Sequence, residues 1–175
     1  MNTPRTMITF KQGNSKFTYR IGGIVIHNRH VLFQRATLDP NDLFWFLPGG
    51  RAELGESAEE TLKREMQEEL GEAIQIQRLL YIVENFFVHT TVHHELGMYF
   101  LMALPTDSYL LQTPGPYVRD DENGLPMIFE WLPIDHLSQL AVRPAFLRNS
   151  LQSLSIQTTH IVQMDSSDNE GMPVI

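Results

Sequence analysis

The segment 57–71 carries the clearest hydrophobic pattern in the chain. Four apolar residues recur at every fourth position, which places them on one face of a helix: Ala58, Leu62, Met66 and Leu70. Ser57 and Glu60 have the spacing of a capping box at the N-terminal end, and Gly71 is typical of a C-terminal cap. The pattern therefore predicts a helix over 57–70 that packs one face on a core.

Most of the remaining chain shows the pattern of strands. Runs rich in β-branched and aromatic residues, separated by Gly, Pro and Asn, predict strands over 8–11, 16–27, 31–36, 43–47, 74–88, 92–104 and 127–132. We expect a polar loop over 112–124, helices over 133–141 and 144–153, and a loose end to the chain. Strands and helices mix without strict alternation, which predicts an α/β (α+β) fold with a mixed β-sheet and helices packed on it.

Composition narrows the classes of protein. A chain of 175 residues fits one domain, which we expect to span 1–164, with 1–16 as an N-terminal β extension and 165–175 as a disordered polar tail. The net charge of −8 argues against a protein that binds a nucleic-acid backbone. The absence of cysteine excludes disulfides, cysteine–zinc modules and thiol catalysis.

The chain shows no pattern of a membrane or secreted protein. Its longest apolar stretch, 96–104, is about half a membrane span, and its N-terminus lacks the apolar core of a signal peptide. We therefore expect a soluble, cytoplasmic protein with no membrane partner. The β-rich segment 1–16 can pair with a second subunit, which leaves a homodimer open.

Three carboxylates crowd the face of the predicted helix that lies opposite its apolar stripe. Glu65, Glu68 and Glu69 have the spacing i, i+3, i+4, and like charges at that spacing disfavour a helix by a few tenths of a kcal/mol per pair. One interpretation is a solvated acidic surface. The other is a site for a hard cation, because Mg²⁺ and Mn²⁺ prefer oxygen ligands and would relieve the repulsion.

The acidic residues belong to a longer pattern. From Gly50 the sequence reads Gly-x5-Glu56-x7-Arg64-Glu65-Met66-x-Glu68-Glu69-x-Gly71. This pattern resembles the signature of the Nudix hydrolases, which cleave nucleoside diphosphates linked to another moiety. One departure is Glu72, at a position that is normally apolar in this family. The resemblance implies a Nudix-type α/β/α sandwich, in which helices cover both faces of a mixed sheet.

The resemblance also implies roles for individual residues. Mg²⁺, or Mn²⁺ in its place, would be held by the carbonyl of Gly49 and the carboxylates of Glu56, Glu65, Glu68 and Glu69. Arg64 is implied as the charge partner that fixes the site, and Gly50 as part of the tight turn beside the cation. The general base would be a glutamate of the helix or a carboxylate outside it, with Glu122 in the polar loop as the candidate and Glu95 as its rival.

Candidates for substrate binding lie in and before the motif. Gly50 is one of them, and Arg35 and Arg51 lie where a substrate phosphate would pass, although each arginine is equally explained as a surface or ion-pairing residue. Trp45 is a candidate for stacking on a base, with burial in the core as the alternative. No residue of this set specifies which base is bound.

The residues present exclude two other kinds of site. The segment 50–57 has the spacing of a P-loop, but Glu56 stands where the phosphate-binding Lys belongs. His89 and His93 invite a zinc site, yet residues four apart in an extended chain are about 13 Å apart, too far to share an ion.

The sequence therefore predicts a Mg²⁺-dependent pyrophosphohydrolase in which a metal-bound water attacks phosphorus. The alternative is a catalytically silent Nudix-like module that binds a nucleotide. The expected ligand is a small nucleotide: a nucleoside triphosphate, an oxidised one included, or a nucleotide sugar. Because no Pro lies between Gly71 and Leu104, the resemblance counts modestly against ADP-ribose.

Overall fold

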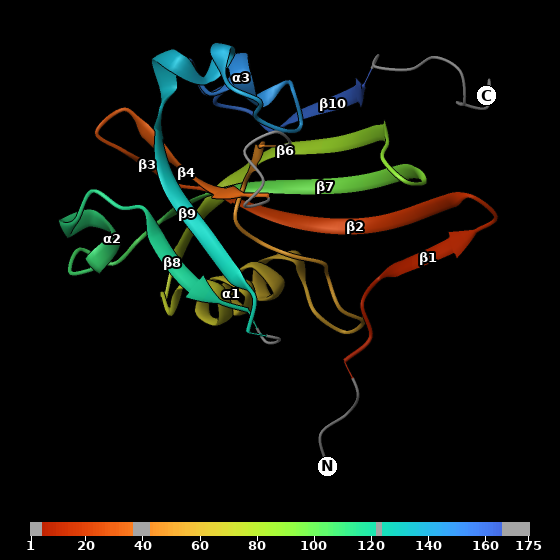
Figure 1. The fold of residues 1–175 in the computed structure, drawn as a ribbon, viewed down its shortest axis with the longest axis horizontal. Helices are drawn as coiled ribbons and strands as arrows, with labels where there is room; N and C mark the ends of the chain where they lie inside the picture. Colours follow the sequence, from red (N-terminus) through yellow and green to blue (C-terminus); the bar gives the residue numbers. More distant parts are fainter. Residues whose placement is uncertain (1–4, 37–42, 122–123, 166–175) are drawn as a thin grey trace.

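The computed structural model describes residues 5–36, 43–121 and 124–165, which form two β-sheets and four helical segments (Figure 1). The first sheet is mixed and has the order β1 (Thr9–Gln12), β2 (Ser15–Ile24), β7 (Val92–Ala103), β6 (Gln75–Val88) and β10 (Thr159–Met164). In it, β2 runs parallel to β7 and β10 runs parallel to β6, whereas the other neighbours are antiparallel.

The second sheet is antiparallel. Its order is β3 (Ile26–His27), β4 (His30–Arg35), β9 (Pro126–Pro133) and β8 (Tyr117–Asp120), and β5 (Trp45–Phe46) also pairs with β4. The helical segments are α1 (Ala58–Leu70), α2 (Tyr109–Gln112), the 3-10 helix η2 (Ile134–Gln139) and α3 (Leu147–Ser150).

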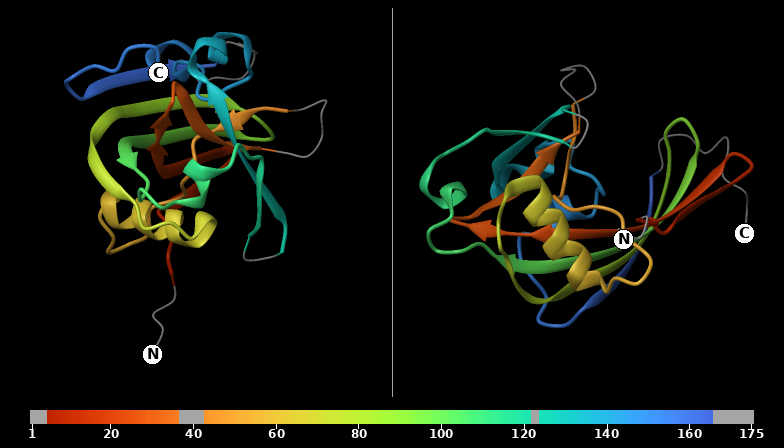
Figure 2. Two further views of the ribbon diagram at one scale, coloured as in Figure 1. Left: turned by 90° about the vertical axis from the view of Figure 1, so that its left-hand side faces the viewer. Right: turned by 90° about the horizontal axis from the view of Figure 1, so that it is seen from below.

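Alternation along β7 divides the core between two faces. Phe100 and Met102 pack in one apolar cluster with α1, whereas Tyr99 and Leu101 pack in a second cluster with η2 and α3. Seen from below, α1 lies across the strands of the first sheet, and α3 lies at the opposite side of the molecule (Figures 1 and 2). The expected mixed sheet with helices on both faces is thus confirmed.

Helix α1 forms as its residues predict. The hydroxyl of Ser57 accepts the backbone N–H of Glu60 at 3.2 Å, and the carboxylate of Glu60 accepts the N–H of Ser57 at 2.8 Å, which completes the capping box. Gly71 ends the helix in the left-handed region, with φ of +71°. The apolar stripe from Leu62 to Leu70 is fully buried.

Glu72, the departure from the family pattern, is buried just beyond α1. Only 6% of its surface is exposed, and its carboxylate accepts a 2.6 Å hydrogen bond from the hydroxyl of Ser108. The loop before α2 therefore supplies the polar partner that a buried carboxylate requires.

Several expectations from the sequence are wrong. The two C-terminal helices are much shorter than 133–141 and 144–153, at six and four residues, and neither has a side-chain N-cap to stabilise its first turn. The expected loop 112–124 contains β8, and the expected loose end contains β10. Both strands pair with partners that the local pattern does not reveal.

Two expectations about the ends of the chain stay predictions. Residues 1–4 and 166–175 lie outside the described residues, so a disordered tail stays a prediction. Strand β1 pairs with β2 of its own chain at the edge of the first sheet, and a homodimer also stays a prediction. None of the helices within the described ranges is long and apolar enough to span a membrane.

The N-terminal cap of α1 gives a test of the fold. We expect Ser57→Ala to lower the free energy of unfolding by about 1 kcal/mol, because an orphaned N–H group of the first turn loses its acceptor. Urea denaturation measures this loss. Ser57→Asn keeps an acceptor and serves as the control, so an equal loss in both variants would contradict the role of the cap.

Candidate active site

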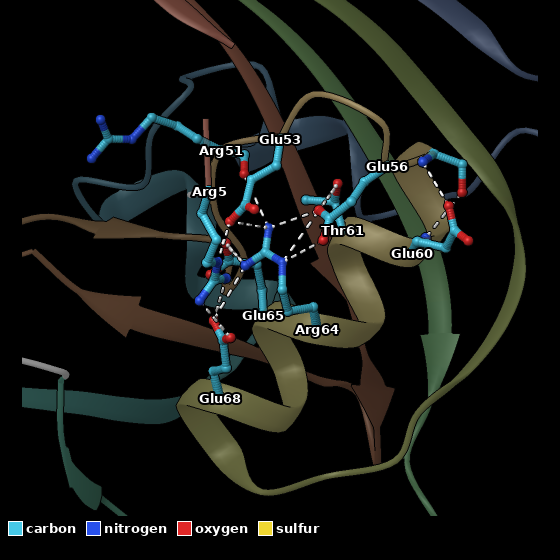
Figure 3. A network of polar contacts seen from close by, with 10 residues as sticks. Arg5, Arg51, Glu53, Glu56, Glu60, Thr61, Arg64, Glu65 and Glu68 are labelled. Carbon is cyan, nitrogen blue, oxygen red and sulfur yellow. Dashed lines mark hydrogen bonds and ion pairs between the residues drawn. The ribbon is translucent and has the colours of Figure 1, made fainter. Parts of the chain in front are cut away.

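Arg64 lies at the centre of the acidic residues of α1 (Figure 3). Its Nε donates to Glu56 at 2.9 Å, and its Nη1 donates to Glu65 at 2.7 Å and to Glu68 at 3.2 Å. Its Nη2 also donates to the backbone carbonyl of Arg51 at 3.3 Å. One guanidinium group therefore binds three glutamates and the preceding loop, and it holds the pKa of Glu56 below its usual value.

A second arginine reaches the cluster from the N-terminal segment. The Nε of Arg5 donates to Glu53 at 2.6 Å, and its Nη1 lies 3.0 Å from Glu68 (Figure 3). Glu53 is almost fully buried and also lies 3.5 Å from Arg64. Arg5 was missed from the sequence because it stands far outside the segment 50–71.

The turn before α1 requires glycine at both of its positions. Gly49 has φ of +129°, and a Cβ there would lie 2.3 Å from the carbonyl oxygen of Ile21. A Cβ on Gly50 would lie 2.2 Å from the carboxylate of Glu65. The backbone of the turn is also tied to β2, since the N–H of Ile21 donates to the carbonyl of Gly50 at 2.8 Å. The turn thus packs directly against the acidic helix.

Glu69 faces this turn and has a strongly shifted pKa. Burial and the nearby charge of Glu65 raise the pKa of Glu69 to about 7, against the opposing effects of Arg20 and of the N–H of Gly49. That N–H donates to the Glu69 carboxylate at 3.3 Å. A carboxylate in this position is costly to ionise unless a further positive charge stands beside it.

The donor chemistry of this corner fits a hard divalent cation. Glu65, Glu68 and Glu69 and the carbonyl of Gly49 offer only oxygen ligands, and the repulsion between Glu65 and Glu69 is what a cation would relieve. Across the described part of the chain, no three acidic or histidine side chains converge on one point. The reason is that Glu65 and Glu68 are turned toward Arg64, so a cation has to replace arginine contacts.

Two of the predicted substrate contacts, which stay predictions, have a partner within the protein. The guanidinium of Arg35 and the indole N–H of Trp45 both bind Glu130 on β9, at 2.5 and 2.8 Å. The side chain of Arg51 is exposed and points away from the acidic cluster (Figure 3). Glu122, the candidate general base, lies outside the described residues.

A cavity of about 220 Å³ adjoins the turn, and three of its polar residues come from the first sheet: Arg20, Asn85 and Glu95. The rival base Glu95 therefore lies in a cavity, where burial raises the pKa of its carboxyl group. Arg20 and Asn85 were missed from the sequence, although polar residues inside otherwise apolar strand runs are a usable signal.

Arg20 connects this cavity to the turn. Its Nη2 donates to the carbonyls of Leu47 and Gly49, each at 3.1 Å. The carbonyl of Gly49, implied as a cation ligand, is therefore bound to a guanidinium group.

Comparison with known proteins decides the family. A model of the NUDIX domain matches residues 16–154. The chain belongs to the Nudix family. A curated relative, a putative mutator protein MutT4 of Mycobacterium tuberculosis (strain CDC 1551 / Oshkosh), is 34% identical over 106 residues, which are 57% of this chain and 37% of the relative. This Nudix chain therefore spans just over a third of that relative's length.

Solved structures share the Nudix fold. A UDP-X diphosphatase superposes with a TM-score of 0.58 at 16% identity, over 82% of this chain and 66% of the other. A MutT NUDIX hydrolase from Burkholderia pseudomallei superposes with a TM-score of 0.53 at 22% identity, over 79% and 98% of the two chains. At these identities the likeness establishes the fold.

The shifted pKa of Glu69 predicts a pH dependence of stability in the cation-free protein. Because its pKa rises from 4.5 to about 7 on folding, the folded state holds this proton more tightly than the unfolded state does. Its contribution to the unfolding free energy is therefore favourable below about pH 4.5 and is lost as the pH rises toward 7. The loss is up to about 3.5 kcal/mol, at roughly 1.4 kcal/mol per pKa unit over a shift from 4.5 to about 7.

Denaturation in EDTA across this range measures the effect. Glu69→Gln should remove this part of the pH dependence, whereas Glu59→Gln, at an exposed position of the same helix, should leave it in place. A wild-type curve that coincides with the Glu69→Gln curve across the range would contradict the assignment.

Proposed function

We propose that the protein is a Mg²⁺-dependent Nudix pyrophosphohydrolase, with Mn²⁺ as a substitute cation. It cleaves a nucleoside diphosphate linked to another moiety by attack of water on phosphorus. The observation that carries this proposal is the corner of α1, where Glu65 and Glu69 lie against the Gly49–Gly50 turn and Arg64 binds Glu65 and Glu68.

Each residue of the corner has a definite task in this proposal. Glu65, Glu68 and Glu69 and the carbonyl of Gly49 hold the cation, with Glu56 as an additional ligand or a water-mediated contact. When bound, the cation neutralises phosphate charge and lowers the pKa of its water ligand. Arg64 is a positioning residue, because it fixes Glu56 and Glu65 from the side of the loop.

The general base stays open between a glutamate of α1, Glu122 and Glu95. Glu95 lines the cavity beside Arg20, and burial raises the pKa of its carboxyl group. For the domain, we propose residues 1–164 as one unit, which contains the matched segment 16–154.

The substrate is a small nucleotide, either a nucleoside triphosphate, an oxidised one included, or a nucleotide sugar. Among the proteins that share the fold, a UDP-X diphosphatase is named for a nucleoside diphosphate linked to another moiety, which supports the second class. A net charge of −8 suits a substrate whose phosphates reach the protein through a cation rather than through a basic surface.

The test is a hydrolysis screen with Mg²⁺ and with Mn²⁺ over nucleoside triphosphates, nucleotide sugars and dinucleotides, in which both products are identified. We expect a nucleoside monophosphate or related phosphate as one product. Glu69→Gln should lower kcat/KM at least about 100-fold, because it removes a charged ligand of the cation.

Glu59→Gln is the matched control on α1 and should retain activity, and Mn²⁺ affinity by titration calorimetry should fall only in the Glu69 variant. An intact panel in both metals, together with tight nucleotide binding, would favour the silent nucleotide-binding module instead.

A further inference from the structure

The cavity beside the turn has a polar floor and aromatic walls. The floor carries Asn85 of β6 and Glu95 of β7, which stand directly opposite each other in the sheet. The walls include three partly buried rings: Phe44, Phe46 and Phe87. Flat apolar walls around a few polar groups are typical of a ligand site.

Burial of Asn85 and Glu95 costs free energy unless their polar atoms form hydrogen bonds. Asn85 is only 7% exposed, and it stands opposite Glu95 in the sheet, close enough to lower the pKa of the Glu95 carboxyl group against the larger effect of burial. Neither group has its full hydrogen-bonding capacity met by this one contact, since an amide offers two N–H donors and an acceptor, and a carboxylate can accept several bonds. Such a pair can therefore bind further donors and acceptors that enter the cavity.

The walls favour a planar ligand. The guanidinium of Arg20 lies 5.1 Å from the ring centre of Phe46, and that of Arg143 lies 4.5 Å from the ring centre of Phe44. Each contact places a guanidinium group over the ring of one of these lining residues. Stacking of a base on an aromatic side chain contributes about 1–3 kcal/mol.

The size and position of the cavity limit what it holds. About 220 Å³ is less than the roughly 300–1,000 Å³ of sites that enclose a whole drug-sized ligand, so one part of a nucleotide fits inside. Arg20 lines the cavity and also binds the carbonyl of Gly49, whose N–H binds Glu69. A ligand in the cavity therefore has its remaining atoms next to the acidic corner.

We infer that this cavity binds the nucleobase of the substrate and that Asn85 and Glu95 determine which base is accepted, which assigns Glu95 to base recognition and leaves the general base to a glutamate of α1 or to Glu122. The inference rests on the proposed hydrolase function and specifies its recognition of substrate. The base stacks among Phe44, Phe46 and Phe87, its polar edge meets the Asn85–Glu95 pair, and the phosphates extend past Arg20 toward α1.

This arrangement makes base preference sensitive to the atoms of the pair. A site that presents buried hydrogen-bonding groups rejects bases that leave those groups unpaired. Glu95→Gln preserves the shape of the side chain and replaces one acceptor oxygen by a donor. We expect it to change the ratio of kcat/KM between the best and second-best base by at least about tenfold.

The experiment compares kcat/KM over the common ribo- and deoxyribonucleoside triphosphates for wild type, Glu95→Gln, Asn85→Ala and Phe46→Ala. Phe46→Ala should weaken all bases together, mainly through KM, because stacking does not discriminate among them. The matched control is Glu84→Gln, which neighbours Asn85 on β6 but binds His160 on β10 instead of lining the cavity. Its base ratios should equal those of wild type.

A binding measurement in EDTA makes the test independent of turnover. Nucleoside monophosphates, titrated by calorimetry, should bind the wild type with the same base order as the hydrolysis shows, and Glu95→Gln should alter that order. Thermal melting of each variant verifies that it is folded. Base ratios unchanged in both Glu95→Gln and Asn85→Ala, or a preference that follows ribose against deoxyribose, would overturn the inference.

The two proposals fail in different ways. If no nucleotide is hydrolysed in either metal, the proposed function fails, and the EDTA titration still decides whether the cavity binds a base. If nucleotides are hydrolysed but the substitutions in the cavity leave base selection unchanged, the hydrolase proposal stands and the assignment of Asn85 and Glu95 is wrong.

Discussion

The site depends on the partial neutralisation of crowded negative charge by arginine. Five glutamates of the loop and α1 stand close together, and two guanidinium groups, Arg5 and Arg64, bind four of them. A guanidinium suits this task because its five N–H donors form a rigid fork, whereas the ammonium of lysine is a single point of charge. The negative charge that the two arginines leave without such a partner is at Glu69, which faces the turn and whose pKa is raised to about 7.

The part of the fold that the sequence predicts well is the part that local residues determine. The capping box, the apolar stripe and Gly71 specify α1 within fifteen residues, and the long strands β6 and β7 follow from β-branched and aromatic runs. Strands β8 and β10 were not predicted, because their own residues show no clear strand pattern. They are stabilised by pairing with β9 and β6. A one-dimensional pattern carries no information about such partners.

The same limit applies to the site. The acidic residues and Arg64 lie in one short segment, so their meeting could be predicted from helical spacing. Arg35 and Trp45 were assigned to the substrate, but their partner is Glu130, about ninety residues away in sequence. Arg5 and Arg20 went unnoticed for the converse reason, since each reaches the site from a strand or segment that the motif does not include.

Arg20 contacts both the cavity and the turn, and this restricts which substitutions the protein tolerates at that position. It lies against the ring of Phe46 on one side and holds the backbone of the Gly49 turn on the other. Any replacement would disturb both places together, whereas Phe44 and Phe87 can vary without touching the turn. Substitutions at other residues of the cavity can therefore change ligand binding alone, whereas a substitution at Arg20 changes the cavity and the turn at the same time.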